Sequence, residues 1–150
     1  MRYLAIDLGE KRTGLAVGDD GSGIVTPLEV IVTGSEAERM RRLERAVAAQ
    51  EPDALVLGVP LNMDGSVGPA AARSAKLAEE LTRRTGRPVF KMDERLTSAA
   101  ADAQMARSGL THGQKKARRD ALAAAAILRD FLATRGGAGP EPPAASSGRS

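Results

Sequence analysis

The chain has 150 residues, 42% of them hydrophobic and 27% charged, a balance typical of one globular domain. It contains no cysteine, which excludes disulfides and thiolate metal sites, and its formal net charge of +3 permits a phosphate-rich partner. Aromatic residues make up only 2%, so stacking of single-stranded bases is not expected. We find neither a signal pattern nor an apolar run of roughly 20 residues, and expect a cytoplasmic protein with no membrane partner.

The first part of the chain predicts an antiparallel meander of three strands. Arg2–Leu8 and Thr13–Val17 read as apolar strands joined by the turn Gly9–Arg12, and Leu28–Val32 follows as the third. Asp7 places a carboxylate within the first apolar run, where burial of an unpaired acid is costly. This acid is therefore expected either to hydrogen-bond to the glycine turn or to coordinate a cation.

A helix, a strand and a polar loop are predicted next. Ser35 is the expected N-cap of a helix that runs to about Gln50, with Glu38 three residues later forming a capping box. Ala54–Val59 is a continuous apolar run, typical of a parallel strand covered on both faces. Pro60–Gly68, rich in Gly, Asn and Asp, is predicted to be a loop.

The following segment predicts a helix from about Pro69 to Thr85, ended by Gly86, and then the strand Pro88–Met92. Asp93 and Glu94 come directly after this strand. Open α/β sheets place their sites at the carboxyl ends of parallel strands, so these two acids are candidate site residues.

Two further helices complete the predicted domain. Thr97 or Ser98 is expected to cap a helix to about Ser108, and the loop Gly109–Gln114 precedes a final helix over Lys116–Thr134. The right-handed crossover rule makes the two later strands parallel additions to the meander. We therefore predict an α/β fold: a mixed five-stranded sheet flanked by helices over residues 1–135. Residues 136–150, rich in Gly, Pro, Ala and Ser, are predicted to be a disordered tail.

The acids and the basic turn together indicate phosphodiester chemistry. Asp120 lies in the first turns of the last helix, where the helix dipole alone would also favour an acid. Hard carboxylate ligands suit Mg²⁺ or Mn²⁺, and two such ions can activate water and stabilise a leaving oxygen. Gly9 and Gly14 permit close backbone approach, and Lys11 and Arg12 between them can contact phosphate.

Two alternatives remain open at this point. The pattern Asp7-x-Gly9-x-x-x-x-Gly14 also occurs in the phosphate-binding hairpin of actin-like and sugar-kinase proteins, although a 150-residue chain supplies only one of their two lobes. Arginine and lysine also cluster at 39–42, 83–87 and 115–119. Each cluster can be a phosphate-binding surface or simply a solvated helix face.

Four stretches in order carry a family resemblance: "AIDLGEKRTGLAVGDD", "VLGVPLNMDGSVGP", "DERLTSAAA" and "KKARRDALAAAAILRDFL". They resemble the YqgF family, also called RuvX-like or Holliday-junction-resolvase-like, over almost all of residues 1–133. The resemblance implies an RNase H-like fold. It also implies a metal-dependent nuclease that matures the 5′ end of precursor 16S rRNA in ribosome biogenesis.

The resemblance assigns three metal-binding acids: Asp7, then Asp93 or Glu94 with Glu94 preferred, then Asp120. The family usually has an aliphatic residue just before the last aspartate, whereas this chain has Arg119. Residues expected near the substrate are Lys11, Arg12, Asn62, Asp64, Arg95, Lys116 and Arg119.

The leading hypothesis is a two-metal nuclease acting on precursor 16S rRNA within a pre-ribosomal particle. One alternative is a Holliday junction resolvase on branched DNA, which predicts a homodimer rather than a monomer. Another is a non-catalytic RNA-binding assembly factor, which predicts RNA binding without metal. The choice of RNA over DNA rests on the resemblance alone.

Overall fold

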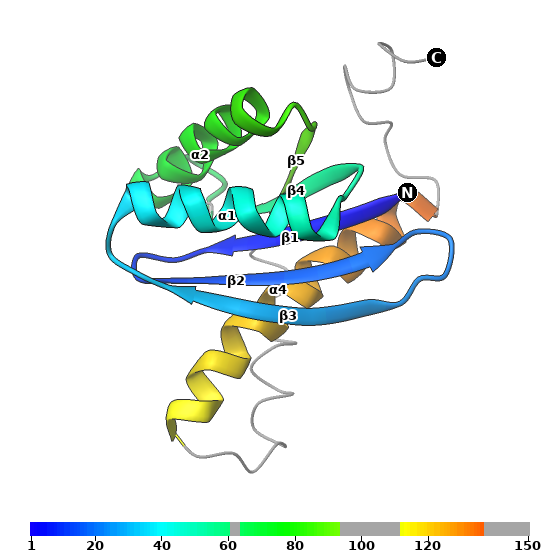
Figure 1. The fold of residues 1–150 in the computed structure, drawn as a ribbon, viewed down its shortest axis with the longest axis horizontal. Helices are drawn as coiled ribbons and strands as arrows, with labels where there is room; N and C mark the ends of the chain where they lie inside the picture. Colours follow the sequence, from blue (N-terminus) through cyan, green and yellow to red (C-terminus); the bar gives the residue numbers. More distant parts are fainter. Residues whose placement is uncertain (61–63, 94–111, 137–150) are drawn as a thin grey trace.

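A computed structural model describes residues 1–60, 64–93 and 112–136, with only the backbone described at 112–120 and 135–136. These residues form one sheet with helices on both sides (Figure 1). The strands are β1 (Arg2–Leu8), β2 (Arg12–Asp19), β3 (Val25–Val32), β4 (Ala54–Val59) and β5 (Val89–Asp93). The helices are α1 (Glu36–Gln50), α2 (Pro69–Thr85) and α4 (His112–Gly136). The predicted helix ending near Ser108 lies outside the described residues.

The sheet has the strand order β3-β2-β1-β4-β5. The first three strands are antiparallel neighbours, and β4 and β5 add in parallel next to β1. This arrangement confirms the predicted mixed five-stranded sheet. Because β1 is the middle strand, residues along it have neighbours on both sides.

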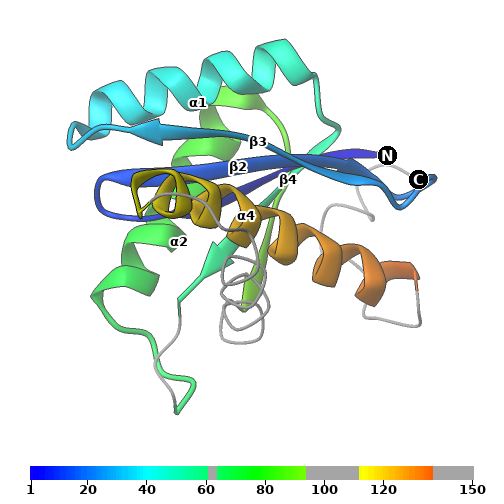
Figure 2. The same ribbon diagram turned by 90° about the horizontal axis from the view of Figure 1, so that it is seen from below.

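Strand alternation divides the core into two clusters, one on each face of the sheet. Leu4 and Ile6 of β1 pack under α1 and α2, whereas Tyr3 and Ala5 pack against α4. The ring of Phe131 on α4 meets Tyr3 edge-on at 5.2 Å between centroids. Figure 2 shows α4 crossing the strands on the face away from α1. The two faces of the sheet are therefore covered by different helices.

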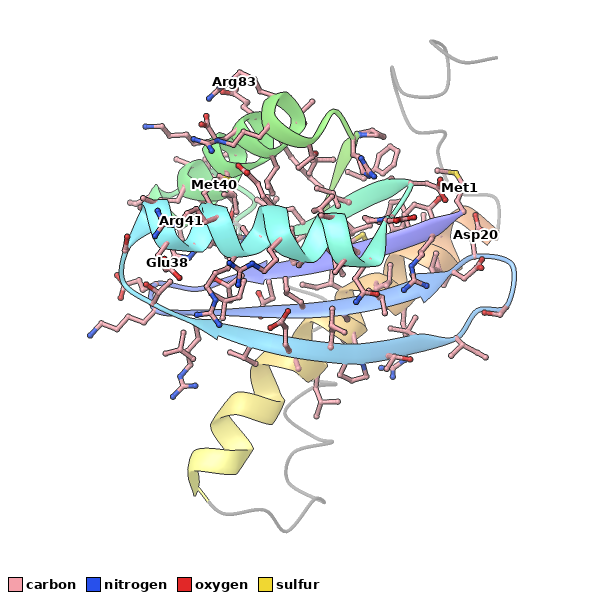
Figure 3. All side chains as sticks on the ribbon, viewed as in Figure 1. Met1, Asp20, Glu38, Met40, Arg41 and Arg83 are labelled. Carbon is pink, nitrogen blue, oxygen red and sulfur yellow. The ribbon has the colours of Figure 1, made fainter. Side chains whose placement is uncertain are left out.

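The helix caps follow the sequence signals, with one exception. The Ser35 Oγ accepts a hydrogen bond from the Glu38 N–H at 3.1 Å, which confirms the N-cap. The capping box is incomplete, because the Glu38 carboxylate pairs with Arg41 instead of returning to Ser35 (Figure 3). The Ser35 N–H donates to the Thr33 hydroxyl at 3.1 Å. At the end of α2, Gly86 has a φ of 72°, the left-handed conformation that suits glycine.

Some helices and strands have other bounds than predicted, chiefly where a neighbouring strand extends a segment beyond its own sequence pattern. Strands β2 and β3 are longer than predicted because each continues along the ladder of its neighbour. Asp93 belongs to β5, where it pairs with Val59, rather than to the segment after it. Helix α4 begins at His112, inside the predicted loop Gly109–Gln114. Residues 137–150 of the predicted tail lie outside the described part, in which no helix is long and apolar enough to cross a membrane.

Candidate active site

Asp7 lies on the middle strand, half-buried, between β2 and β4. Its antiparallel partner on β2 is Gly14, and the preceding residue, Ile6, pairs in parallel with Leu57 of β4. The β2 neighbour of this acid is therefore a residue without a side chain. Gly14 adds no side chain that could cover the carboxylate from the side of β2.

Helix α4 covers the face of the sheet on which Asp7 lies. Phe131 in its C-terminal half contacts Tyr3 at the start of β1, so its N-terminal half lies toward the other end of that strand (Figure 1). Asp120 occupies the position one helical turn before Ala124, which is fully buried against the sheet. The backbone thus places the positions of Asp7 and Asp120 on the same side of the sheet.

Asp93 lies on the opposite face. Phe90 and Met92 of β5 pack toward α4, whereas Val89 packs against the cluster under α1 and α2. Alternation along β5 places Asp93 with Val89. The structure therefore does not bring this acid to the side of the sheet that carries Asp7.

Of the other predicted site residues, some lie outside the described residues and some have only their backbone described. Asn62, Glu94 and Arg95 lie outside the described residues, and Lys116 and Arg119 lie on α4 where only the backbone is described. Asp64 is described: its Oδ1 accepts from the Ser66 N–H at 2.9 Å and from the Ser66 hydroxyl at 2.7 Å. This carboxylate therefore shapes the loop that enters α2.

The type of donor fits a hard divalent cation, because Asp7 and the expected partners Glu94 and Asp120 offer only carboxylate oxygens. In the part of the chain whose side chains are described, no three acidic or histidine groups gather closely enough to hold a metal. Two of the three expected ligands lie beyond that part. Asp7 alone among them has a described side chain.

The turn between β1 and β2, which begins two residues after Asp7, leads into β2 with two cations, Lys11 and Arg12. Lys11 is exposed and Arg12 is half-buried. Neither side chain forms an ion pair or hydrogen bond with any side chain or backbone group in the described ranges. Their expected contact with an anionic ligand stays a prediction.

The arginine clusters of α1 and α2 are mostly engaged within the protein. Arg41 pairs with Glu38 on α1 (Figure 3). On α2, Arg83 pairs with Glu80, and Arg84 bridges Glu80 and Glu44. These contacts hold the pKa of Glu80 below its usual range, chiefly through the hydrogen bond from Arg83. For these residues the solvated helix face is the better interpretation.

Arg39 is different: the prediction that it belongs to a surface cluster of arginines is wrong. Its side chain is fully buried. The signal that could have found it is helical spacing: Arg39 lies four residues before Leu43, on the buried stripe of α1. Its hydrogen bonds lead to the turn that carries Lys11 and Arg12, as described below.

A groove of about 540 Å³ opens between α1 and α2. Leu8, Met40 and Leu77 supply apolar lining, and charged side chains including Glu36 and Arg73 surround it. Since these helices cover the face opposite Asp7, the groove is separate from the carboxylate site.

The chain is similar to known proteins over most of its length. The family model described as "RuvX: Holliday junction resolvase" matches residues 1–134. A protein of Thiobacillus denitrificans named "Putative pre-16S rRNA nuclease" is 44% identical over 133 residues, covering 88% of this chain and 91% of its own. A protein of the same name from Anaeromyxobacter is 39% identical and covers 88% of this chain and 96% of its own.

Solved structures agree on the fold. Thermus thermophilus RuvC in complex with a Holliday junction substrate has a TM-score of 0.56 at 17% identity, covering 91% of this chain and 96% of that one. The fowlpox virus Holliday junction resolvase has a TM-score of 0.57 at 13% identity, covering 89% and 99%. At these identities the likeness shows a shared RNase H-like architecture, which confirms the predicted fold class.

Proposed function

Because this chain belongs to the RuvX family, we propose that it is a divalent-metal-dependent nuclease that processes the 5′ end of precursor 16S rRNA. Hydrolysis of nucleic acid follows from the family; the RNA substrate is supported by the names of relatives 36–44% identical to this chain. A cytoplasmic protein acting on a pre-ribosomal particle is consistent with that substrate.

The observation that carries the proposal is the setting of Asp7. A half-buried carboxylate stands on the middle strand opposite Gly14, on the face to which α4 brings the position of Asp120. A hard cation is the partner that such oxygen ligands favour. The site would therefore form between β1 and α4 rather than in the groove between α1 and α2.

We assign Asp7, Glu94 and Asp120 as the residues that would hold the ions, with Asp7 shared between them. Glu94 is preferred to Asp93 because Asp93 lies on the other face of the sheet. When bound, Mg²⁺ or Mn²⁺ would supply water activation and charge stabilisation at the leaving oxygen.

The remaining residues position the substrate. Lys11 and Arg12 hold backbone phosphates beside Asp7, and Arg95, two residues after β5 in the sequence, is proposed to do the same. Asn62, Asp64, Lys116 and Arg119 are secondary candidates for such contacts. With few aromatic residues, recognition would depend on backbone shape rather than base stacking.

The test is cleavage of a labelled RNA carrying the precursor 16S rRNA 5′ leader, with Mn²⁺, Mg²⁺ or EDTA, beside a four-way DNA junction. We expect metal-dependent RNA cleavage that falls by about 10²–10³-fold in Asp7→Asn, the size of effect seen when one charge-stabilising group is lost. Circular dichroism of this variant checks that it is folded.

The junction arm tests the second candidate, which the family description favours. Cleavage of the junction but not the RNA would replace the proposal with a resolvase. RNA binding that is unaffected by EDTA and by Asp7→Asn, without any cleavage, would replace it with a non-catalytic binding factor.

A further inference from the structure

The turn that carries Lys11 and Arg12 is held by its backbone carbonyls. Every carbonyl from Gly9 to Arg12 accepts a hydrogen bond. The donors are Arg73 Nη2 to Gly9 at 3.5 Å, Arg39 Nη2 to Glu10, the Thr33 N–H to Lys11 at 2.8 Å, and the Gly9 N–H to Arg12 at 2.9 Å. The turn is thus attached to α1, to α2 and to the end of β3, while its two basic side chains make no bond within the described ranges.

Arg39 is the central member of this arrangement. Besides the Glu10 carbonyl, its guanidinium donates to the Thr13 hydroxyl at 3.1 Å and to the Thr33 carbonyl at 3.1 Å. Both the Arg39 side chain and Thr13 are fully buried. One planar group therefore joins the turn, the first residues of β2 and the segment that enters α1, which a flexible ammonium could not do at once.

A buried cation is costly unless it is paired, and Glu36 supplies the partner. Its carboxylate accepts from Arg39 Nη1 at 2.7 Å and from Arg73 Nη2 at 3.4 Å. The Arg39 hydrogen bond, followed by its charge and that of Arg73, holds the pKa of Glu36 below the usual value. Glu36 thus orients both arginines that reach the turn.

We propose that Arg39 is a positioning residue, which fixes the turn so that Lys11 and Arg12 meet the phosphates of a nucleic-acid backbone next to Asp7. The inference rests on the nucleic-acid binding in the proposed function. A turn with four bonded carbonyls presents its cations already ordered, so less conformational entropy is lost when phosphate binds. Arg39 acts through the turn and does not itself touch the substrate.

The experiment measures binding of a fluorescein-labelled precursor 16S rRNA 5′-leader RNA in EDTA by fluorescence anisotropy, over a series of KCl concentrations. Replacing both Lys11 and Arg12 by alanine should reduce the slope of log affinity against log salt by about 1–2, since each phosphate contact contributes roughly 0.7–0.9. Arg39→Lys keeps the charge but should reduce the slope by at least half as much. Added to the double variant, it should reduce the slope no further.

A matched control is Arg41→Lys, an exposed arginine on the same helix that pairs with Glu38 and is expected to keep the wild-type slope. Thermal melting accompanies each variant. An Arg39→Lys protein with the wild-type slope would overturn the proposal. So would a triple variant in which Arg39→Lys lowers the slope of the Lys11 and Arg12 double variant by as much as it lowers the wild-type slope.

Glu36→Gln keeps the proposal testable if Arg39→Lys does not fold. Its side chain is 71% exposed, so this change should be tolerated. Removal of a negative charge alone would strengthen RNA binding, whereas loss of turn positioning weakens it. Weaker binding of Glu36→Gln supports the proposal, and stronger or equal binding contradicts it.

The binding assay separates this inference from the nuclease proposal, because it needs neither metal nor cleavage. A wild-type protein that binds the RNA with these slopes but never cleaves it would leave the role of Arg39 supported and the nuclease function rejected. Metal-dependent cleavage with no effect of Arg39→Lys on the salt slope would support the nuclease function and reject the role of Arg39. Absence of RNA binding by the wild type in EDTA would reject the role of Arg39, and the cleavage assay with Mg²⁺ or Mn²⁺ would then decide the nuclease function by itself.

Discussion

Asp7 and Asp93 lie on opposite faces of one sheet, although both stand near the carboxyl ends of parallel strands. Asp7 shares its face with Tyr3 and Ala5 under α4, and Asp93 shares the other face with Val89. Adjacent residues of a strand point to opposite faces of the sheet. Two consecutive acids at the end of a strand are therefore not equivalent as ligands for a site on one face.

This relationship predicts different effects of two conservative substitutions. Glu94→Gln should reduce metal-dependent cleavage by about 10²–10³-fold, as expected for loss of a group that stabilises the transition state. Asp93→Asn should leave the cleavage rate within a few-fold of the wild type. Single-turnover cleavage of the leader RNA measures both, and the opposite ranking would assign Asp93 as the ligand.

Glycine at position 9 is predicted to be required by the turn. A Cβ added there would lie 2.5 Å from the carbonyl oxygen of Arg12, the atom that accepts the Gly9 N–H bond. Gly9→Ala should therefore lower the free energy of unfolding by about 1–3 kcal/mol, a cost typical of overpacking. Urea denaturation measures it.

The control for this change is Gly34→Ala, since a Cβ at position 34 meets nothing within 4 Å. We expect that variant to be as stable as the wild type or slightly more stable, because alanine reduces the freedom of the unfolded chain. Equal stability of both alanine variants would show that the turn can relax around the added methyl group.

Two serine-to-alanine substitutions are predicted to have opposite signs. Ser35→Ala removes the N-cap of α1 and should cost about 1 kcal/mol. Ser74→Ala, on α2, should instead stabilise the protein by about 1 kcal/mol. The Ser74 Oγ is buried without a hydrogen-bond partner in the described part of the chain, and alanine removes that unsatisfied group. Denaturation midpoints measured together compare the two directly.

The Glu36 ion pairs predict a dependence of stability on pH. Since folding lowers the pKa of this carboxyl from 4.5, its contribution is fully present above pH 4.5 and is lost as the pH falls through the lower folded-state pKa. The stability difference between wild type and Glu36→Gln should thus be constant near neutral pH and shrink below 4.5.

Glu29→Gln is the charge-matched control, because Glu29 is exposed and makes no ion pair within the described residues. Urea denaturation across the acid range gives the difference for each variant. A wild-type advantage over Glu36→Gln that persists unchanged well below pH 4.5 would contradict the assigned role of the ion pairs.

For the elements that the structure describes, local chemistry in the sequence was enough to predict their type and their order. Ala54–Val59 and Pro69–Thr85 have the bounds that apolar runs, proline and Gly86 predicted, because such signals act within a few residues. The crossover rule also predicted that the two later strands are parallel additions to the meander, but their place beside β1, which makes the strand of Asp7 the middle one, came from the structure.

Tertiary structure decided the features that depend on distant neighbours. Residues of α1 and α2, together with the residue that follows β3, hold the turn at Gly9–Arg12, and no local pattern connects Arg39 or Arg73 with its carbonyls. The face occupied by Asp93 became known only when β5 extended along β4 to include it. A strand ends where its neighbouring strand stops completing its hydrogen bonds. A charged side chain can be buried only where other groups replace the water around it. Both are properties of the packed chain and not of the segment.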